Sequence, residues 1–354
     1  MKSSTLAWLA FSVLSLTLAG FVGGVIQFHR YYQSLPSNHF IGNKESNVNV
    51  LKEKGFPFSF LVIGDTQSSK RAEKLIELGL REGNPSFMFI LGDFVMEPDV
   101  WHHRFFLNQM NTEIKPSFPV FLVPGNHDID YTSSKIKKAE RRVTPKIYES
   151  LYGARNFHFV YNNCLFIICG IDRNTADYLN DLRDTLSQKA GGKKYIFVFI
   201  HFPPKGLDEN IQGPLKKEKK FFSLLEAYNV TDCFFGDYHG YWRGQRNGVN
   251  LIVSGGGGHL KSSQPQWGKF HHILRITVDE NTISEGMIVL PGEVSSFSGT
   301  LKKMTFIHLF PMIPLMKEGR WGLYLLFILF LSWGIYSVRM LFHSIPKKGE
   351  NIKH

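Results

Sequence analysis

The chain has 354 residues, 43% of them hydrophobic, which is enough for one large core or at most two small ones. Its formal net charge of +11 is compatible with nucleic acid, an anionic membrane surface or an acidic substrate as partner. The basic residues are spread out and no recognised nucleic-acid motif is present, which argues against nucleic acid. All three cysteines lie in apolar, strand-like runs and indicate no disulfide framework: Cys164, Cys169 and Cys233.

The N-terminal segment is apolar enough to cross a bilayer. Residues 6–28 contain no charged side chain and come close to the roughly 20 apolar residues that a membrane span needs. We assign residues 1–28 to an N-terminal transmembrane anchor. A cleaved signal peptide is the alternative, because the small residues at 18–20 offer a cleavage site. The polar residues 29–55 that follow resemble a linker.

The central region alternates between strand-like and helix-like apolar patterns. Helices are expected over residues 70–81, 101–110 and 176–188. Strands are expected over 58–63, 87–91, 119–123, 195–200, 231–235 and 251–254, together with a strand pair joined at Asn162-Asn163 within 157–171 and a closing hairpin of 272–278 and 283–290. This order predicts an α/β domain over residues 56–292, with a mixed sheet or two packed sheets covered by helices.

The C-terminal part resembles a second membrane attachment. Residues 293–320 form a membrane-proximal connector, residues 321–342 a C-terminal transmembrane helix, and residues 343–354 a basic tail. Lys2 and the basic tail favour cytoplasmic termini by the positive-inside rule, although two basic residues before the second span point the other way. We therefore expect two spans with both termini in the cytoplasm and the large domain outside it.

Five segments that follow predicted strands carry oxygen or nitrogen ligands. A single aspartate at the end of a strand often caps the next helix, but capping does not explain five such segments in series. Because ligands in open α/β sheets gather at the carboxyl ends of strands, we expect these side chains to converge on a two-metal site. The segments are Gly64-Asp65-Thr66-Gln67, Gly92-Asp93, Gly125-Asn126-His127-Asp128, His201 and Gly236-Asp237-Tyr238-His239.

The last segment adds a pair of ligands. Asp237 and His239 flank Tyr238, and strand alternation would place them on the same face. His259 follows a run of glycines and either lines the substrate cleft or is unrelated to it. Tyr241, just after the segment, either contacts substrate or packs at the rim. The remaining histidines lack a ligand-spaced partner and are expected to be surface or packing residues: His102, His103, His158, His271 and His272.

These motifs resemble the calcineurin-like metallophosphoesterase superfamily over residues 58–290. The segment Gly125-Asn126-His127-Asp128 is the most specific part of the resemblance, and the run from Ile252 to Gly258 is also similar to many members. The resemblance implies two mixed β-sheets sandwiched between helices, in addition to the two transmembrane helices. It also implies a hydrolase that cleaves a phosphomonoester or phosphodiester with water activated by two metals.

The resemblance further implies roles for individual residues. Asp93 would bridge the two metals, and His127 would stabilise the transition state and protonate the leaving group rather than bind metal. One metal would be held by Asp65, Gln67, Asp93 and His239. The other would be held by Asp93, Asn126, His201 and Asp237.

Two positions depart from the family pattern, which usually has histidine where this chain has Gln67 and Asp237. Both changes replace an imidazole nitrogen with an oxygen, and harder ligands favour manganese, with iron or magnesium also suitable and zinc less so. The losses also admit an inactive membrane receptor or scaffold that retains the fold. For an active enzyme we expect a phosphate-ester substrate, such as a lipid headgroup, a nucleotide or a cell-envelope precursor. The sequence does not indicate an oligomeric state.

Overall fold

The computed structural model describes residues 3–33, 40–132, 135–170, 178–211, 213–261, 265–292, 294–295, 297–309 and 320–344. The chain divides into two compact units. One unit comprises Pro36–Lys303, and the other joins Met1–Leu35 to Met304–His354. Part of the predicted connector, the basic tail from residue 345 and the predicted start of the helix at 176–177 lie outside the described residues.

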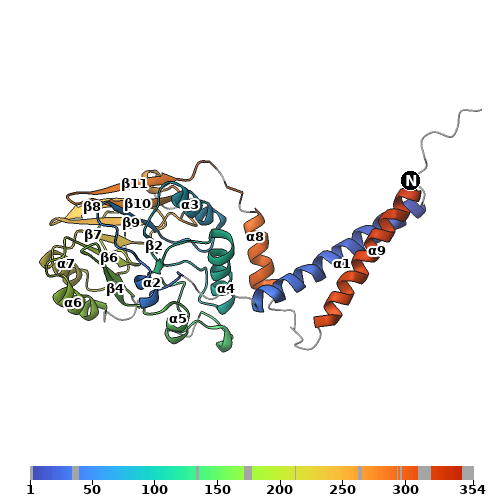
Figure 1. The fold of residues 1–354 in the computed structure, drawn as a ribbon, viewed down its shortest axis with the longest axis horizontal. Coiled ribbons are helices and arrows are strands. Elements are labelled where there is room, and N and C mark those ends of the chain that lie inside the picture. The colour runs from blue at the N-terminus through green and yellow to red at the C-terminus, as the bar shows by residue number, and fades with distance from the viewer. Residues whose placement is uncertain are drawn as a thin grey trace, which may run out of the picture. The chain divides into compact units, whose positions relative to one another are not determined.

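Five strands form the first sheet of the larger unit, in the order β11-β10-β1-β2-β3. Strands β11, β10 and β2 of this sheet are labelled in Figure 1. The strands β1, β2 and β3 run parallel, whereas β10 pairs antiparallel with both β1 and β11. Their bounds are β1 Phe58–Ile63, β2 Phe87–Ile90, β3 Val120–Leu122, β10 His272–Val278 and β11 Ile283–Val289.

Six strands form the second sheet, in the order β4-β5-β6-β7-β9-β8. Its four central strands are parallel, and an antiparallel strand closes each edge. The predicted pair of mixed sheets is therefore confirmed. The bounds are β4 Phe157–Tyr161, β5 Cys164–Cys169, β6 Tyr195–Ile200, β7 Asp232–Phe235, β8 Tyr241–Arg246 and β9 Val249–Ser254.

An aromatic core joins the two sheets. Alternate residues of β1 point toward the second sheet, and Phe60 packs edge-on against Phe166 and Phe197 with ring centroids 5.5 and 5.4 Å apart. Phe89 of β2 stacks on Phe199 of β6. All five rings are completely buried. This contact holds the carboxyl ends of strands from both sheets at one edge of the sandwich.

Helices cover the outer faces of both sheets. Gly79 of α3 approaches Leu61 and Ile273 of the first sheet, where a Cβ would lie 3.0 Å from Leu61. On the second sheet, α6 and α7 contribute Leu182 and Phe221 to the buried cluster. The helices of this unit are α2 Glu45–Asn49, α3 Lys70–Arg81, α4 Val100–Asn108, α5 Pro145–Tyr152, α6 Tyr178–Lys189, α7 Glu218–Ala227 and α8 Phe297–Lys303, with short helical turns at Gln109–Ile114, Ala139–Arg141 and Gln266–Gly268.

Strand β8 and the helices α2, α5 and α8 were not predicted from the sequence. Strand β8 was missed because it is mostly polar and its side chains are only half-buried or exposed. Its Tyr241 donates a hydrogen bond to Glu285 of β11 at 2.6 Å, so this ring packs between the sheets. Helix α8 was missed because it lies within the expected connector. The buried His103 and His272 are packing residues, as the sequence suggested.

The segment before β1, assigned to a linker, contains packed residues. Ile41 forms a parallel bridge with Val120, and α2 follows. The amide of Asn43 donates to the carbonyl oxygens of Leu122 and Ala154 at 2.7 and 2.9 Å and accepts from the Leu122 N–H at 2.9 Å. Asn43 therefore connects this segment to β3.

The smaller unit contains two long apolar helices, α1 Ser3–Gln33 and α9 Arg320–Ser344, together with the helical turn Met304–Leu309. The stretches Ser4–Gln27 and Gly322–His343 are long and apolar enough to cross a membrane. Trp8 contacts Tyr336 and Gly23 contacts Phe327, so the helices pack antiparallel. The buried Ser12 hydroxyl donates to that of Ser337 at 3.1 Å, a contact typical of paired membrane helices.

We expect Asn43→Ala to destabilise the larger unit by about 2 kcal/mol, because it leaves buried backbone groups without partners. Chemical denaturation of the purified chain measures this change. Asn49→Ala, at an exposed position of α2, should change the free energy of unfolding by less than about 0.5 kcal/mol. Equal stability of the two variants would contradict the role given to Asn43.

Candidate metal centre

The side chains predicted as ligands follow strands of both sheets. In the first sheet, Asp65 follows β1 and Asp93 follows β2. In the second sheet, His201 follows β6 directly, and Asp237 and His239 follow β7. Because the aromatic core fixes the two sheets face to face, these strand ends form one site.

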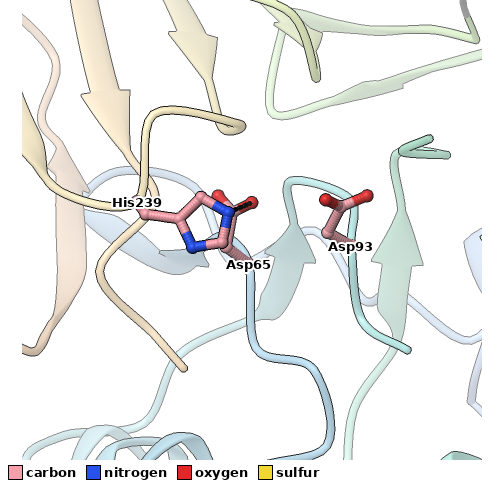
Figure 2. A group of neighbouring side chains, drawn as sticks. All are labelled: Asp65, Asp93 and His239. Atoms are coloured by element: carbon pink, nitrogen blue, oxygen red, sulfur yellow. Dashed lines mark ion pairs between the residues drawn. The ribbon is translucent and has the colours of Figure 1, made fainter. Parts of the chain in front are cut away.

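Asp65, Asp93 and His239 form a first group, in which one ligand atom from each side chain lies within 4.8 Å of the others. Figure 2 shows the His239 ring beside the carboxylate of Asp65, with Asp93 on a neighbouring loop. Asp65 is completely buried, and neither of its carboxylate oxygens has a hydrogen-bond partner. Burial raises the pKa of Asp65 well above its usual value. A buried carboxylate without a donor is costly unless a cation compensates for it.

Asp93, His201 and Asp237 form a second group of the same kind. His201 Nε2 lies 3.4 Å from Asp93 Oδ1 and 3.7 Å from Asp237 Oδ1. Burial disfavours the charged ring, but the carboxylates, Asp93 foremost, outweigh it and raise the pKa of His201 to about 10. The group therefore attracts positive charge, whether this is a proton or a metal ion.

Both imidazoles are oriented as metal ligands usually are. His201 Nδ1 lies 2.7 Å from the carbonyl oxygen of Leu91, and His239 Nδ1 lies 2.7 Å from that of His259. A proton on each Nδ1 leaves Nε2 as a lone-pair donor facing the carboxylates. His201 Nε2 also lies 3.3 Å from Asn126 Oδ1. With the neutral ring two lone pairs would face each other there, and either a proton on Nε2 or a cation between the two atoms removes that repulsion.

Gln67 and Asn126 lie beside the two groups. The Gln67 N–H donates to the Asp93 carbonyl oxygen at 2.9 Å, which ties the first two loops together. Asp65, Gln67 and Asp93 have left-handed φ values of 54°, 47° and 50°. Such backbone angles are unfavourable for residues with a Cβ and collect at functional sites.

The predicted strand alternation of Asp237 and His239 is wrong. Strand β7 ends at Phe235, and both residues have a left-handed φ of 58°. The prediction failed because it applied strand alternation to residues 237–239, which lie beyond the end of the strand.

His127 lies at the rim of the site. Its N–H donates to Asp93 Oδ1 at 2.9 Å, and its ring Nδ1 lies 2.5 Å from the carbonyl oxygen of Met96. Its Nε2 lies 3.9 Å from Asp93 Oδ2, and 38% of the side chain is exposed. The ring can therefore reach a bound molecule while its other nitrogen is held by the backbone.

Asp128 supports the site, a role that sequence analysis missed. Its buried carboxylate accepts hydrogen bonds from the N–H groups of Asp93, Gly125 and Val95 at 2.8, 2.7 and 3.2 Å. It thereby joins the loops after β2 and β3. A Cβ on Gly125 would lie 2.3 Å from Asp93 Oδ1, so only glycine permits this close approach. The position of Asp128 in the segment Gly125-Asn126-His127-Asp128 was the available signal.

Three lysines contact the ligand-bearing loops, and one of them, Lys135, belongs to the basic cluster that follows the Gly125-Asn126-His127-Asp128 segment in the sequence. Each ammonium group donates to the backbone carbonyl oxygen of a predicted ligand. The contacts are Lys303 to Gln67 at 2.5 Å, Lys135 to Asn126 at 2.7 Å and Lys261 to Asp237 at 3.3 Å. His259, through its carbonyl bond to His239, also belongs to the surroundings of the site.

Comparison with known proteins supports the resemblance seen in the motifs. A sequence model described as calcineurin-like phosphoesterase matches residues 58–241. No match was found among curated proteins. The fold is similar to that of the purple acid phosphatase PPD1 from yellow lupin (Lupinus luteus) seeds, with a TM-score of 0.52 and 16% identity. That match covers 69% of this chain and 53% of the lupin protein, so the chain spans about half the length of that relative.

Two other solved structures have lower similarity. GAP50, the anchor in the inner membrane complex of Plasmodium, has a TM-score of 0.49 and 15% identity, over 67% of this chain and 86% of that protein. A dimetal phosphatase from Danio rerio has a TM-score of 0.44 and 14% identity, over 66% of this chain and 99% of that protein.

We expect Asp128→Ala to weaken the binding of Mn²⁺ by about 10- to 100-fold, because residues that orient ligands contribute this much to metal affinity. Titration calorimetry on metal-stripped protein in detergent measures the change. The control is Asp184→Ala on the exposed side of α6, which should bind like the parent. An Asp128→Ala protein with unchanged circular dichroism and unchanged Mn²⁺ affinity would contradict the supporting role.

Proposed function

The chain belongs to the calcineurin-like phosphoesterase family, and we propose that it is a membrane-anchored, metal-dependent phosphohydrolase that cleaves a phosphomonoester or phosphodiester. The observation that carries this proposal is the position of Asp93, whose carboxylate belongs to both groups of acidic and imidazole side chains. A carboxylate shared in this way suits two cations about 4 Å apart.

The donor atoms of the site fit two divalent cations. Asp65 supplies buried oxygens without partners, and His201 and His239 supply nitrogens oriented by backbone carbonyls. When bound, such cations stabilise charge on phosphoryl oxygens and make water a better nucleophile. The oxygen-rich set favours manganese, with iron or magnesium as alternatives and zinc less favoured. One cation would take Asp65, Gln67, Asp93 and His239, and the other Asp93, Asn126, His201 and Asp237.

His127 is proposed to protonate the leaving group. In hydrolysis the water oxygen bonds to phosphorus and loses a proton, while the bond from phosphorus to the leaving oxygen breaks. The leaving oxygen gains a proton, so the number of protons is unchanged overall. The Met96 carbonyl fixes Nδ1 of His127, so Nε2 is the nitrogen that can deliver this proton. Its exposure at the rim suits a leaving group that extends out of the site.

The paired helices favour a retained anchor over a cleaved signal peptide. Removal of α1 would expose Gly334 of α9, over which Leu16 packs, and would leave Ser337 without its Ser12 partner. An antiparallel pair also places both ends of the chain on one side of the membrane. We propose that this side is the cytoplasm and that the catalytic domain lies outside it.

We expect the full-length protein with added Mn²⁺ to hydrolyse bis-p-nitrophenyl phosphate or p-nitrophenyl phosphate, and Asp93→Ala to lower kcat by at least about 100-fold. A chelator should remove the activity and Mn²⁺ should restore it. His127→Ala should affect alkyl phosphates far more than nitrophenyl esters, because p-nitrophenolate leaves without protonation.

The control for these variants is His158→Ala, which changes an exposed side chain of β4. Equal rates for the parent and Asp93→Ala would contradict the metal-hydrolase function. Inactivity together with failure to bind Mn²⁺ would instead favour the receptor or scaffold alternative.

We expect the double variant Ser12→Cys/Ser337→Cys to form a disulfide under mild oxidation, because the two side chains are in contact in the helix pair. Mobility on a non-reducing gel after proteolysis between the helices detects it. The three native cysteines are buried and should not interfere. A mature protein that lacks residues 1–20 would contradict the retained anchor.

A further inference from the structure

Helix α8 packs against the loop that carries the first predicted ligands, although it lies beyond the part of the chain matched by the family. The Lys303 ammonium donates to the carbonyl oxygen of Gln67 at 2.5 Å. Gly299 lies against the side chain of Lys70, where a Cβ would come within 3.2 Å. One side of α8 is therefore fixed at the edge of the metal centre.

A second lysine strengthens this attachment. Lys302 forms an ion pair with Glu113 and lies 5.9 Å from the centre of the Phe105 ring. Lys303 is half-buried, and its ammonium is held by the carbonyl oxygen of Gln67. These contacts attach α8 to the larger unit at more than one point.

The other side of α8 exposes large apolar side chains. Phe297 is 75% exposed and Leu301 is 56% exposed. Residues four positions apart lie on the same helical face. Burial of both side chains in an apolar environment would be favourable. The face is therefore suited to an apolar surface.

The position of α8 in the chain, shortly before α9, indicates that this apolar surface is the membrane. Helix α8 ends at Lys303, and α9, which is long and apolar enough to span a membrane, begins at Arg320. Interfacial helices insert Phe and Leu side chains at the boundary between headgroups and acyl chains. We propose that α8 lies on the bilayer surface and that the adjacent metal centre acts on an amphiphilic phosphate ester, whose apolar chains stay in the membrane. This inference rests on the proposed function.

The surroundings of the site match such a substrate. Met96, whose carbonyl holds the His127 ring, is 47% exposed and presents an apolar side chain beside the proposed proton donor. Lys261 is exposed and bonded to the carbonyl oxygen of Asp237, so its charge is available to an anionic headgroup. An apolar side chain and a cation beside the ligand-bearing loops suit a molecule that has both an anionic head and an apolar chain.

The test compares matched esters with the full-length protein in phosphatidylcholine vesicles. One pair is hexadecyl p-nitrophenyl phosphate in the vesicles and ethyl p-nitrophenyl phosphate in solution. The second pair, for a monoesterase, is dioleoyl phosphatidic acid and glycerol 3-phosphate. We expect kcat/KM at equal bulk concentration to be at least about tenfold higher for the long-chain member of the pair that is cleaved.

The variant Phe297→Ser/Leu301→Ser should reduce this preference by about tenfold and leave hydrolysis of the short-chain ester unchanged. The matched control is Val160→Ser, which alters an exposed apolar residue of β4 on the second sheet. A preference that is absent, or that survives in the double variant, would overturn the inference while the phosphohydrolase function stands. No cleavage of any of the four esters would reject the proposed function itself.

A direct measurement does not depend on activity. Phe297→Cys labelled with an environment-sensitive nitrobenzoxadiazole dye should show stronger, blue-shifted emission in vesicles, quenched by spin-labelled lipid. The same label at Val160→Cys should show neither effect. Emission at position 297 that is insensitive to the quencher would contradict the placement of α8 on the bilayer.

Discussion

The constraint on which the rest of the structure depends is the crowding of negative charge in a buried space. Asp65, Asp93 and Asp237 lie around the His201 and His239 rings with little access to solvent. Like charges so close would repel each other in this environment unless positive charge lay between them. The acidic neighbours raise the pKa of His201 to about 10, so the site also favours positive charge on this ring. The surrounding loops hold these groups together despite left-handed backbone angles at several of them.

The rigidity needed for this arrangement comes from the aromatic core. Phenylalanine rings on the facing sides of the two sheets interlock, so the carboxyl ends of β1 and β2 are fixed relative to those of β6 and β7. Asp128 adds hydrogen bonds between two of the ligand-bearing loops, and lysines from distant parts of the chain bind their carbonyl oxygens. The two sheets therefore place the ligand-bearing loops, and hydrogen bonds within and between the loops then fix their positions.

The sequence predicted the framework well because buried strands leave long apolar runs, as in residues 58–63 and 195–200. It also indicated which side chains would converge, since ligands follow strand ends in open sheets. Strand β8 escaped because polar side chains such as Arg243 and Gln245 give no apolar alternation. Contacts such as Lys303 with Gln67, 236 positions apart, depend on tertiary packing that no local pattern encodes.

The three cysteines lie in strands of the second sheet, sealed from solvent. Burial raises the pKa of Cys164 and Cys169 to about 12, so the reactive thiolate is scarce at neutral pH. None of these thiols takes part in a disulfide. The domain can consequently keep the same covalent structure in an oxidising or a reducing compartment, and its folding requires neither an oxidase nor a disulfide isomerase on whichever side of the bilayer it matures.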